Sequence, residues 1–132
     1  MNNTIIQQQY IAQWHDSFVS YIGSLLGVIA GLCERAEATM EDKHVLEALK
    51  GMLTGKDAAD VERDLAAGVV KRSTLDKIVK LNKDMADKCL DHIHMDNLVR
   101  DFWRQMAHIQ IEYNKRSEVQ RLDTLQIPIT ED

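Results

Sequence analysis

The sequence predicts an all-α protein, an antiparallel helical bundle of four to five helices with a long N-terminal helix. The chain of 132 residues contains 6 glycines and a single proline, Pro128, whereas all-β proteins need frequent turns rich in both residues. Apolar residues recur at helical spacing along most of the chain. Residues that favour helix caps stand where these apolar patterns begin and end.

The length and composition indicate one domain followed by a tail. A chain of this size buries about two-thirds of its surface on folding, which is enough for one independent core. Apolar residues make up 45% of the chain, a share too high for a disordered protein. We expect residues 1–116 to form a single helical domain. The helical pattern fades after it, so residues 117–132 are expected to form an extended or mobile tail.

The charges are distributed unevenly along the chain. It carries 16 Lys and Arg against 21 Asp and Glu, a formal net charge of −5. Residues 1–33 contain one acid, Asp16, and no Lys or Arg. This pattern excludes a basic N-terminal arm for nucleic acid, and the acidic balance gives no other reason to expect nucleic-acid binding.

The N-terminus and the cysteines favour a cytoplasmic location. No basic residue precedes the first apolar stretch, unlike in an ordinary signal peptide. Cys33 and Cys89 both lie within apolar helical patterns. We therefore interpret them as buried, reduced thiols and not as a disulfide or a metal-binding pair.

The first helix is the clearest element, expected from about Thr4 to Ala38. Its apolar residues follow alternating steps of three and four, which is a heptad seam. About 30 helical residues span about 45 Å, against a diameter of roughly 36 Å for a compact globule of this size. The protein is therefore expected to be elongated, or this helix to bend. The seam consists of Ile11, Trp14, Phe18, Tyr21, Leu25, Val28 and Leu32.

Capping residues predict the next two helices. Thr39, with Asp42 three residues later, can form a capping box at the start of the second helix. Asp57 is expected to cap a short third helix, which should stop at Gly68, a favourable residue just beyond a helix end.

The final helical section is expected to begin at Ser73, with Asp76 as the acid of its first turn. One continuous helix over residues 74–116 would be about 64 Å long, which is unusual in a small domain. We therefore expect a break near Asp96-Asn97, because either residue can cap a new helix. The lysines of this section form a mixed-charge stripe, of a kind that is usually solvated.

Three glycines of the first helix recur every four residues on the side away from the seam: Gly23, Gly27 and Gly31. Each costs about 1 kcal/mol relative to alanine, and close approach of another backbone is the usual reason for such residues. A second helix of the same chain or of another chain should therefore contact this side, and we expect a homodimer. Trp14 and Trp103 would anchor a partner where they are exposed. The predicted partner or dimer interface comprises Ser20, Gly23, Ser24, Gly27, Ala30, Gly31, Trp14 and Trp103.

The histidines raise a metal site as an alternative. Glu41-x-x-His44 has the spacing found in carboxylate-bridged di-metal bundles, and such a site needs a second copy of the motif. Asp91-x-x-His94 is the nearest match, with Asp in place of Glu. Several ligand positions are missing, so surface or hydrogen-bonded histidines are the simpler interpretation, and we predict no cofactor.

No catalytic arrangement emerges from the sequence, so we expect the protein not to be an enzyme. The segment 51–57 resembles a phosphate loop, but it is one residue short and follows a helix instead of a strand. No Ser/His/Asp or Cys/His set can be identified with any specificity. The excess of uncharged helical surface favours a protein-interaction module, such as a small inhibitor, adaptor or chaperone-like regulator of a larger bacterial or phage protein.

Membrane insertion of the first helix is the second alternative. Residues 17–33 carry no charge, and glycines spaced by four are common where membrane helices pack. This run is at the lower limit for spanning a bilayer, and it includes three serines. We therefore favour burial of this helix in protein over a glycine-zipper membrane helix.

Overall fold

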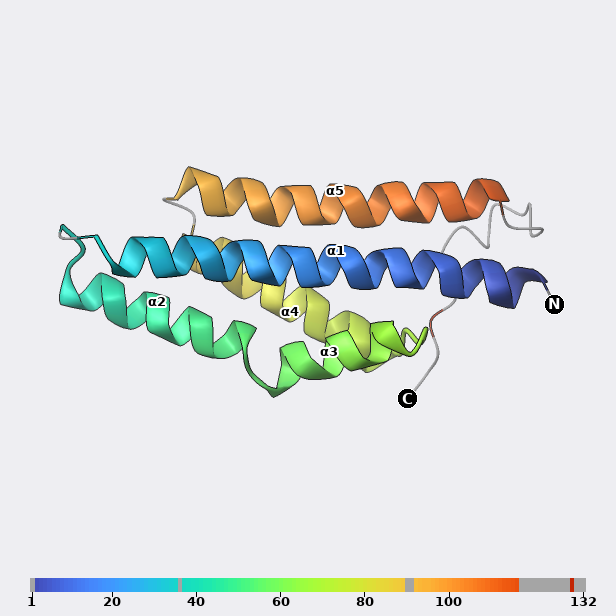
Figure 1. Cartoon of the computed structure of the whole chain (residues 1–132), viewed down its shortest axis with the longest axis horizontal. Coiled ribbons are helices and arrows are strands. Elements are labelled where there is room, and N and C mark those ends of the chain that lie inside the picture. The colour runs from blue at the N-terminus through green and yellow to red at the C-terminus, as the bar shows by residue number, and fades with distance from the viewer. Residues whose placement is uncertain (1, 36, 90–91, 117–128, 130–132) are drawn as a thin grey trace.

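The computed structural model describes residues 2–35, 37–89, 92–116 and 129. They form five helices and no strand, which confirms the predicted all-α bundle with a long N-terminal helix. Figure 1 shows an elongated molecule in which α1 runs along the long axis, with α5 on one side and α2 and α3 on the other. The helices are α1 (Asn2–Cys33), α2 (Met40–Leu53), α3 (Lys56–Ala66), α4 (Arg72–Cys89) and α5 (Ile93–Arg116).

The buried face of α1 follows the predicted seam over most of its length and departs from it near the end. Ile29 is buried in place of Val28, and Leu32 is only half-buried. The interval from Ile11 to Ile29 corresponds to five turns of a straight helix with 3.6 residues per turn, whereas a heptad seam would drift from it. Val28 and Leu32 still pack against the core, but they are only half-buried, and the fully buried line shifts to Ile29. α1 ends at Cys33, before the expected Ala38.

Aromatic rings join α1 to α5 in antiparallel register. The ring centroids of Tyr10 and Tyr113 lie 5.8 Å apart in an edge-to-face arrangement. Phe102 meets Phe18 edge to face at 6.1 Å and stacks on Tyr21 at 4.4 Å. Such pairs stabilise a core beyond the burial of their area. The chain thus pairs its first helix with its last, and this pair forms one side of the core.

The start of α2 and the end of α3 confirm two predicted caps. The Thr39 hydroxyl accepts the backbone N–H of Asp42 at 3.0 Å, and the Asp42 carboxylate accepts that of Thr39 at 3.3 Å. Gly68 has a positive φ of 74°, and its N–H donates to the Leu65 carbonyl at 3.0 Å. Only glycine adopts this conformation without a steric cost, which explains the end of α3. Asp57 is not the cap of α3, because Gly55 takes that place and Asp57 lies in the first turn.

The start of α4 differs from the prediction. The helix begins at Arg72, so Ser73 lies inside it. Thr74 supplies the cap interaction, since its hydroxyl oxygen accepts the backbone N–H of Lys71 at 3.2 Å. The same hydroxyl donates to a carboxylate oxygen of Asp64 in α3 at 2.7 Å. Thr74 thus joins the start of α4 to α3 through one hydroxyl.

The predicted break in the final helical section exists, but earlier than expected. α4 ends at Cys89 and α5 begins at Ile93. Nδ1 of His92 accepts the backbone N–H of Met95 at 3.2 Å, so an imidazole ring takes the role expected of Asp96 or Asn97. Asp96 lies inside the first turn of α5, where its charge suits the helix dipole.

The predicted tail, residues 117–132, lies outside the described residues apart from Ile129. That side chain is half-buried and packs against the core. Cys33 is a free, half-buried thiol, and the side chain of Cys89 lies outside the described part of the chain.

Candidate interaction surface

The outer face of α1 gathers the small residues that the sequence predicted as an interface. α1 packs against α5, α2 and α3, and its remaining face is open to solvent. Every small residue of the prediction lies on this open face. We call it the α1 face and define it by the exposed residues Ser20, Gly23, Ser24, Gly27, Ala30 and Gly31.

The glycines of the α1 face have open space beside them. A Cβ added to Gly23, Gly27 or Gly31 would meet nothing within 4 Å. By contrast, a Cβ at Gly55 would lie 3.0 Å from the carbonyl oxygen of Gly51. The glycines of α1 therefore do not serve a close approach within the described part of this chain. Among the described residues no helix of the same chain takes the place of the expected neighbour, and a helix from another molecule stays a prediction.

Two grooves of different chemistry border the α1 face. On the side of α2 and α3 lies an apolar groove of about 250 Å³, where Val19 is 42% exposed and Glu62 is the one charged lining residue. On the side of α5 lies a smaller groove of about 140 Å³, which is lined by three serines of α1 and by Asp101 and Gln105. The α1 face thus has one apolar edge and one hydroxyl-rich edge.

Charge is absent from the α1 face over most of its length. No charged residue occurs from Ser17 to Cys33 in a protein of net charge −5. Asp16 marks the N-terminal limit and lies 3.4 Å from a ring nitrogen of His15. The face is therefore a neutral strip on an acidic molecule.

The two tryptophans do not join the α1 face. Trp14 is a core residue, and its indole N–H donates to the backbone carbonyl of Met106 at 3.2 Å, so its placement in the interface was wrong. Trp103 is 37% exposed on α5. It is two positions from both Asp101 and Gln105, which line the groove beside the α1 face. Two helical positions correspond to about 200°, so Trp103 lies on the opposite flank of α5.

Among the described residues, the fold does not bring the candidate metal ligands together. Glu41 and His44 are exposed on α2, and His94 is exposed on α5. The rings of His94 and His92 lie 6.4 Å apart, while Asp91 is outside the described residues. Within the part of the chain that the structure describes, no three His, Cys, Asp or Glu residues form a group able to hold a metal.

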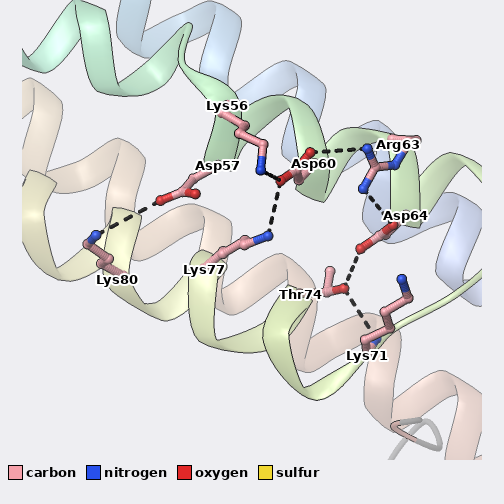
Figure 2. A network of polar contacts seen from close by, with 9 residues as sticks. All are labelled: Lys56, Asp57, Asp60, Arg63, Asp64, Lys71, Thr74, Lys77 and Lys80. Atoms are coloured by element: carbon pink, nitrogen blue, oxygen red, sulfur yellow. Dashed lines mark hydrogen bonds and ion pairs between the residues drawn. The ribbon is translucent and has the colours of Figure 1, made fainter. Parts of the chain in front are cut away.

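A polar network between α3 and α4 was missed by sequence reasoning. Figure 2 shows Lys56, Arg63 and Lys77 converging on the carboxylate of Asp60. Asp60 is only 7% exposed, and its oxygens lie 3.1 Å from Lys77, 3.1 Å from Arg63 and 3.8 Å from Lys56. The hydrogen bond from Lys77, which outweighs desolvation, lowers the pKa of Asp60 below its ordinary value of 3.8. Lys77 therefore belongs to a helix contact instead of a solvated stripe.

The rest of the network follows the same helix pair. Asp64 accepts the hydroxyl proton of Thr74 at 2.7 Å, and Lys80 lies 3.9 Å from Asp57. The three aspartates of α3 (Asp57, Asp60 and Asp64) occur at steps of three and four, which places them on one face of the helix. That spacing was the signal in the sequence from which the network could have been found. The network holds α3 to α4, and we assign it no chemistry of its own.

By length and composition, the segment Ile5–Cys33 of α1 could cross a membrane. Part of its apolar character comes from buried residues such as Ile11, Phe18 and Leu25, but Val19 is exposed. Only 22% of its most apolar stretch is buried in the bundle. α1 thus packs one face on α5, α2 and α3 and leaves the other face open to solvent.

No protein-family model matches the chain, and no curated protein and no solved structure is significantly similar to it.

Proposed function

We propose that the protein is a non-enzymatic protein-interaction module that acts as a homodimer through the α1 face. One observation carries the proposal: Gly23, Gly27 and Gly31 border open space. Each interior glycine costs about 1 kcal/mol relative to alanine, and the described part of the chain makes no use of the space gained. A second helix that crosses α1 near Gly27 would use it, because glycines allow two backbones to approach closely.

A second copy of the chain suits this face better than a charged partner. Two copies of net charge −5 repel each other least where their surfaces are neutral, as from Ser17 to Cys33. A two-fold contact sets the same patch against itself, which a neutral face allows. The exposed side chain of Val19 and the apolar groove beside it would add apolar area to the contact.

The dimer would leave the outer flank of α5, with Trp103, available to a larger protein. Exposed tryptophans are frequent anchors of protein interfaces. We therefore propose that the protein is a small inhibitor, adaptor or chaperone-like regulator that acts in the cytoplasm. This assignment is argued from the surfaces of the molecule alone.

Replacement of Gly27 by Leu tests the dimer. The larger side chain would keep the two helices apart, so the mass measured by light scattering should fall from dimer to monomer. Gly51→Leu is a matched control, because Gly51 is also an exposed glycine inside a helix, with nothing within 4 Å of an added Cβ. A Gly27→Leu protein that keeps the dimer mass, or a wild type that is monomeric at every concentration, would contradict the proposal.

Membrane insertion of α1 is the second candidate, because Ile5–Cys33 has a suitable length and composition. Insertion would require the aromatic contacts between α1 and α5 to open. Purification without detergent as a particle of defined mass, with α1 protected in hydrogen exchange, would count against it. Recovery in a membrane fraction that needs detergent for release would favour it over the dimer.

A further inference from the structure

The outer side of α5 is open to solvent. Among the described helices, α5 packs against α1 and α4, and Figure 1 shows it at the edge of the bundle. A line of exposed residues follows this outer side from the start of α5 to its last turn. Helical spacing places these residues within about 80° of one another around the helix. We call this line the α5 stripe, and it comprises Ile93, Arg100, Arg104, Ala107, Ile111 and Lys115.

The charged residues of the α5 stripe all have the same sign. They are the cations Arg100, Arg104 and Lys115, in a chain of net charge −5. The acids of α5 lie at the two edges of the stripe, with Asp96 on one edge and Asp101 and Glu112 on the other. The stripe is therefore a local basic surface on an acidic protein.

Each cation of the stripe forms an ion pair with an acid of its own helix. The distance to the acid is 3.0 Å for Arg100, 3.4 Å for Arg104 and 3.6 Å for Lys115. The three cationic side chains nevertheless remain 65%, 76% and 68% exposed. Exposed pairs of this kind contribute little to stability, and these do not join α5 to another helix. The fold alone therefore does not account for the cations.

Lys77 of α4 shows how a cation serves the fold in this protein. Its side chain lies 3.1 Å from the carboxylate of Asp60 in α3, which is only 10% exposed. That pair joins two helices. In α5, the helix dipole favours Lys115 in the last turn, but it gives no advantage to Arg100 and Arg104 in the first half of the helix. The two arginines are therefore available to another molecule.

Apolar side chains accompany the cations. Ile93 is 76% exposed and Ile111 is 50% exposed. Trp103, which is 37% exposed, borders the stripe about one helical turn from both Arg100 and Ala107. Tryptophan and arginine are the residues most often found where protein interfaces concentrate their binding energy. The surface thus combines charge that attracts a partner with apolar area that holds it.

We propose that the α5 stripe binds an acidic helical segment of the larger protein. This inference rests on the proposed function, which leaves the outer flank of α5 to such a partner, and it adds the chemistry of that partner. Carboxylates on one face of a helix recur every three or four residues. Arg100 and Arg104 are likewise one turn, or about 6 Å, apart. Apolar residues between the carboxylates would cover Ile111 and Trp103.

A nucleic acid or an anionic membrane suits the stripe less well. Both carry negative charge over a wide surface, which would also face the acids elsewhere on a protein of net charge −5. Charges in solution act over about 8 Å at physiological salt. A short acidic segment that lies along the stripe therefore meets mainly its cations, and complementary charge of this kind determines the partner and the rate of binding.

A synthetic helical peptide tests the proposal. The probe is a fluorescently labelled peptide of about 20 residues, which is long enough to reach from Arg100 to Lys115. It carries Glu and Leu on one face, and a second peptide with Gln in place of every Glu is its matched control. We expect the Glu peptide to bind about tenfold more tightly in fluorescence anisotropy, and we expect added salt to reduce this difference.

Two variants of the stripe and one matched control sharpen the test. Arg104→Glu should weaken binding of the Glu peptide about fivefold, because an attractive charge becomes a repulsive one. Ile111→Ser should weaken it about threefold through lost apolar contact. Lys50→Glu makes the same change of net charge at an exposed site on α2, which does not pack against α5 among the described contacts. This control should bind the peptide as the wild type does.

The same titrations are made in the Gly27→Leu background, which tests the stripe apart from the α1 face. Selective binding of the Glu peptide in this background would support the stripe even if the wild type proves to be a monomer. Equal binding of the Glu and Gln peptides would overturn the proposal and leave the dimer unaffected. It would also be overturned by an Arg104→Glu protein that is folded by circular dichroism and binds as wild type. Tighter binding to phosphatidylserine vesicles or to single-stranded RNA than to the Glu peptide would count against an acidic protein segment in the same way.

Discussion

The pair α1–α5 and the pair α3–α4 are joined by different chemistry. The first contact is filled by the aromatic rings of Tyr10, Phe18 and Tyr21 on α1 and of Phe102 and Tyr113 on α5. The second is formed by carboxylates, lysines and a threonine hydroxyl. The aromatic contact places the large side chains of α1 on its buried side. The outer side can therefore consist of small, uncharged residues. The ionic contact leaves charges at the surface of α3 and α4. The difference shows why the neutral α1 face, and not the charged pair, is the candidate for self-association.

The largest effect is expected in the aromatic contact. Phe102→Ala removes a buried ring that meets both Phe18 and Tyr21. The loss of transfer free energy and the cavity left behind should lower the free energy of unfolding by about 3–5 kcal/mol, as measured by urea denaturation. Trp103→Ala is the neighbouring control, and it should cost much less because Trp103 is partly exposed. Equal losses of unfolding free energy in both variants would show that the aromatic contact is not the main source of stability between α1 and α5.

A smaller effect is expected in the polar contact. Thr74→Val keeps the shape of a fully buried side chain but removes the hydroxyl that links Lys71, Thr74 and Asp64. We expect a loss of about 1–3 kcal/mol in urea denaturation, because Asp64 is left with less hydrogen bonding in a buried position. Thr74→Ser retains the hydroxyl and should recover most of the loss. If Ser and Val behave alike, the contact depends on packing and not on the hydrogen bond.

The smallest effect should depend on pH. The pKa of Asp60 is lowered in the folded protein, chiefly by the hydrogen bond from Lys77. The ionised carboxylate therefore stabilises the fold at pH values above 3.8, the ordinary pKa of an Asp side chain. This contribution is lost as the pH falls through the lower pKa that Asp60 has in the folded protein. Asp60→Asn should lower the urea midpoint at neutral pH, and the difference from wild type should shrink in acid. The effect is modest because Lys56 and Arg63 are largely exposed and screened by solvent.

Asp101→Asn is the control for that pH dependence. Asp101 lies 3.4 Å from Arg104 in an exposed pair. Such a pair contributes little, so the variant should track wild type from neutral pH into acid. A difference for Asp60→Asn that stays constant with pH would contradict a role for its ionised carboxylate.

Local signals in the sequence were sufficient where the cap and its partner are close in the chain. Thr39 and Asp42 are three residues apart, and Gly68 completes the end of α3 with Leu65. The same reasoning missed the start of α4, where the capping side chain Thr74 also bonds Asp64 of α3. A residue from another helix cannot be identified from a capping pattern.

The α1 face illustrates the same limit. Helical periodicity predicted that Gly23, Gly27 and Gly31 lie away from the seam, and all three are exposed. Periodicity could not separate Trp14 from Trp103, since both fit apolar patterns. The indole of Trp14 is buried against the backbone of Met106, a contact between residues far apart in sequence.

The pairing of the first helix with the last has a consequence for the order of folding. The Trp14–Met106 contact closes a separation of 92 residues, whereas the Thr74–Asp64 contact closes one of 10. The longer closure costs about 2 kcal/mol more in chain entropy. We therefore expect α3 and α4 to associate early, whereas α1 is synthesised before α5 and has to wait for it. Until α5 is made, the rings of Tyr10, Phe18 and Tyr21 lack their aromatic partners on that helix, so this stage exposes the most apolar surface of α1 in the nascent chain.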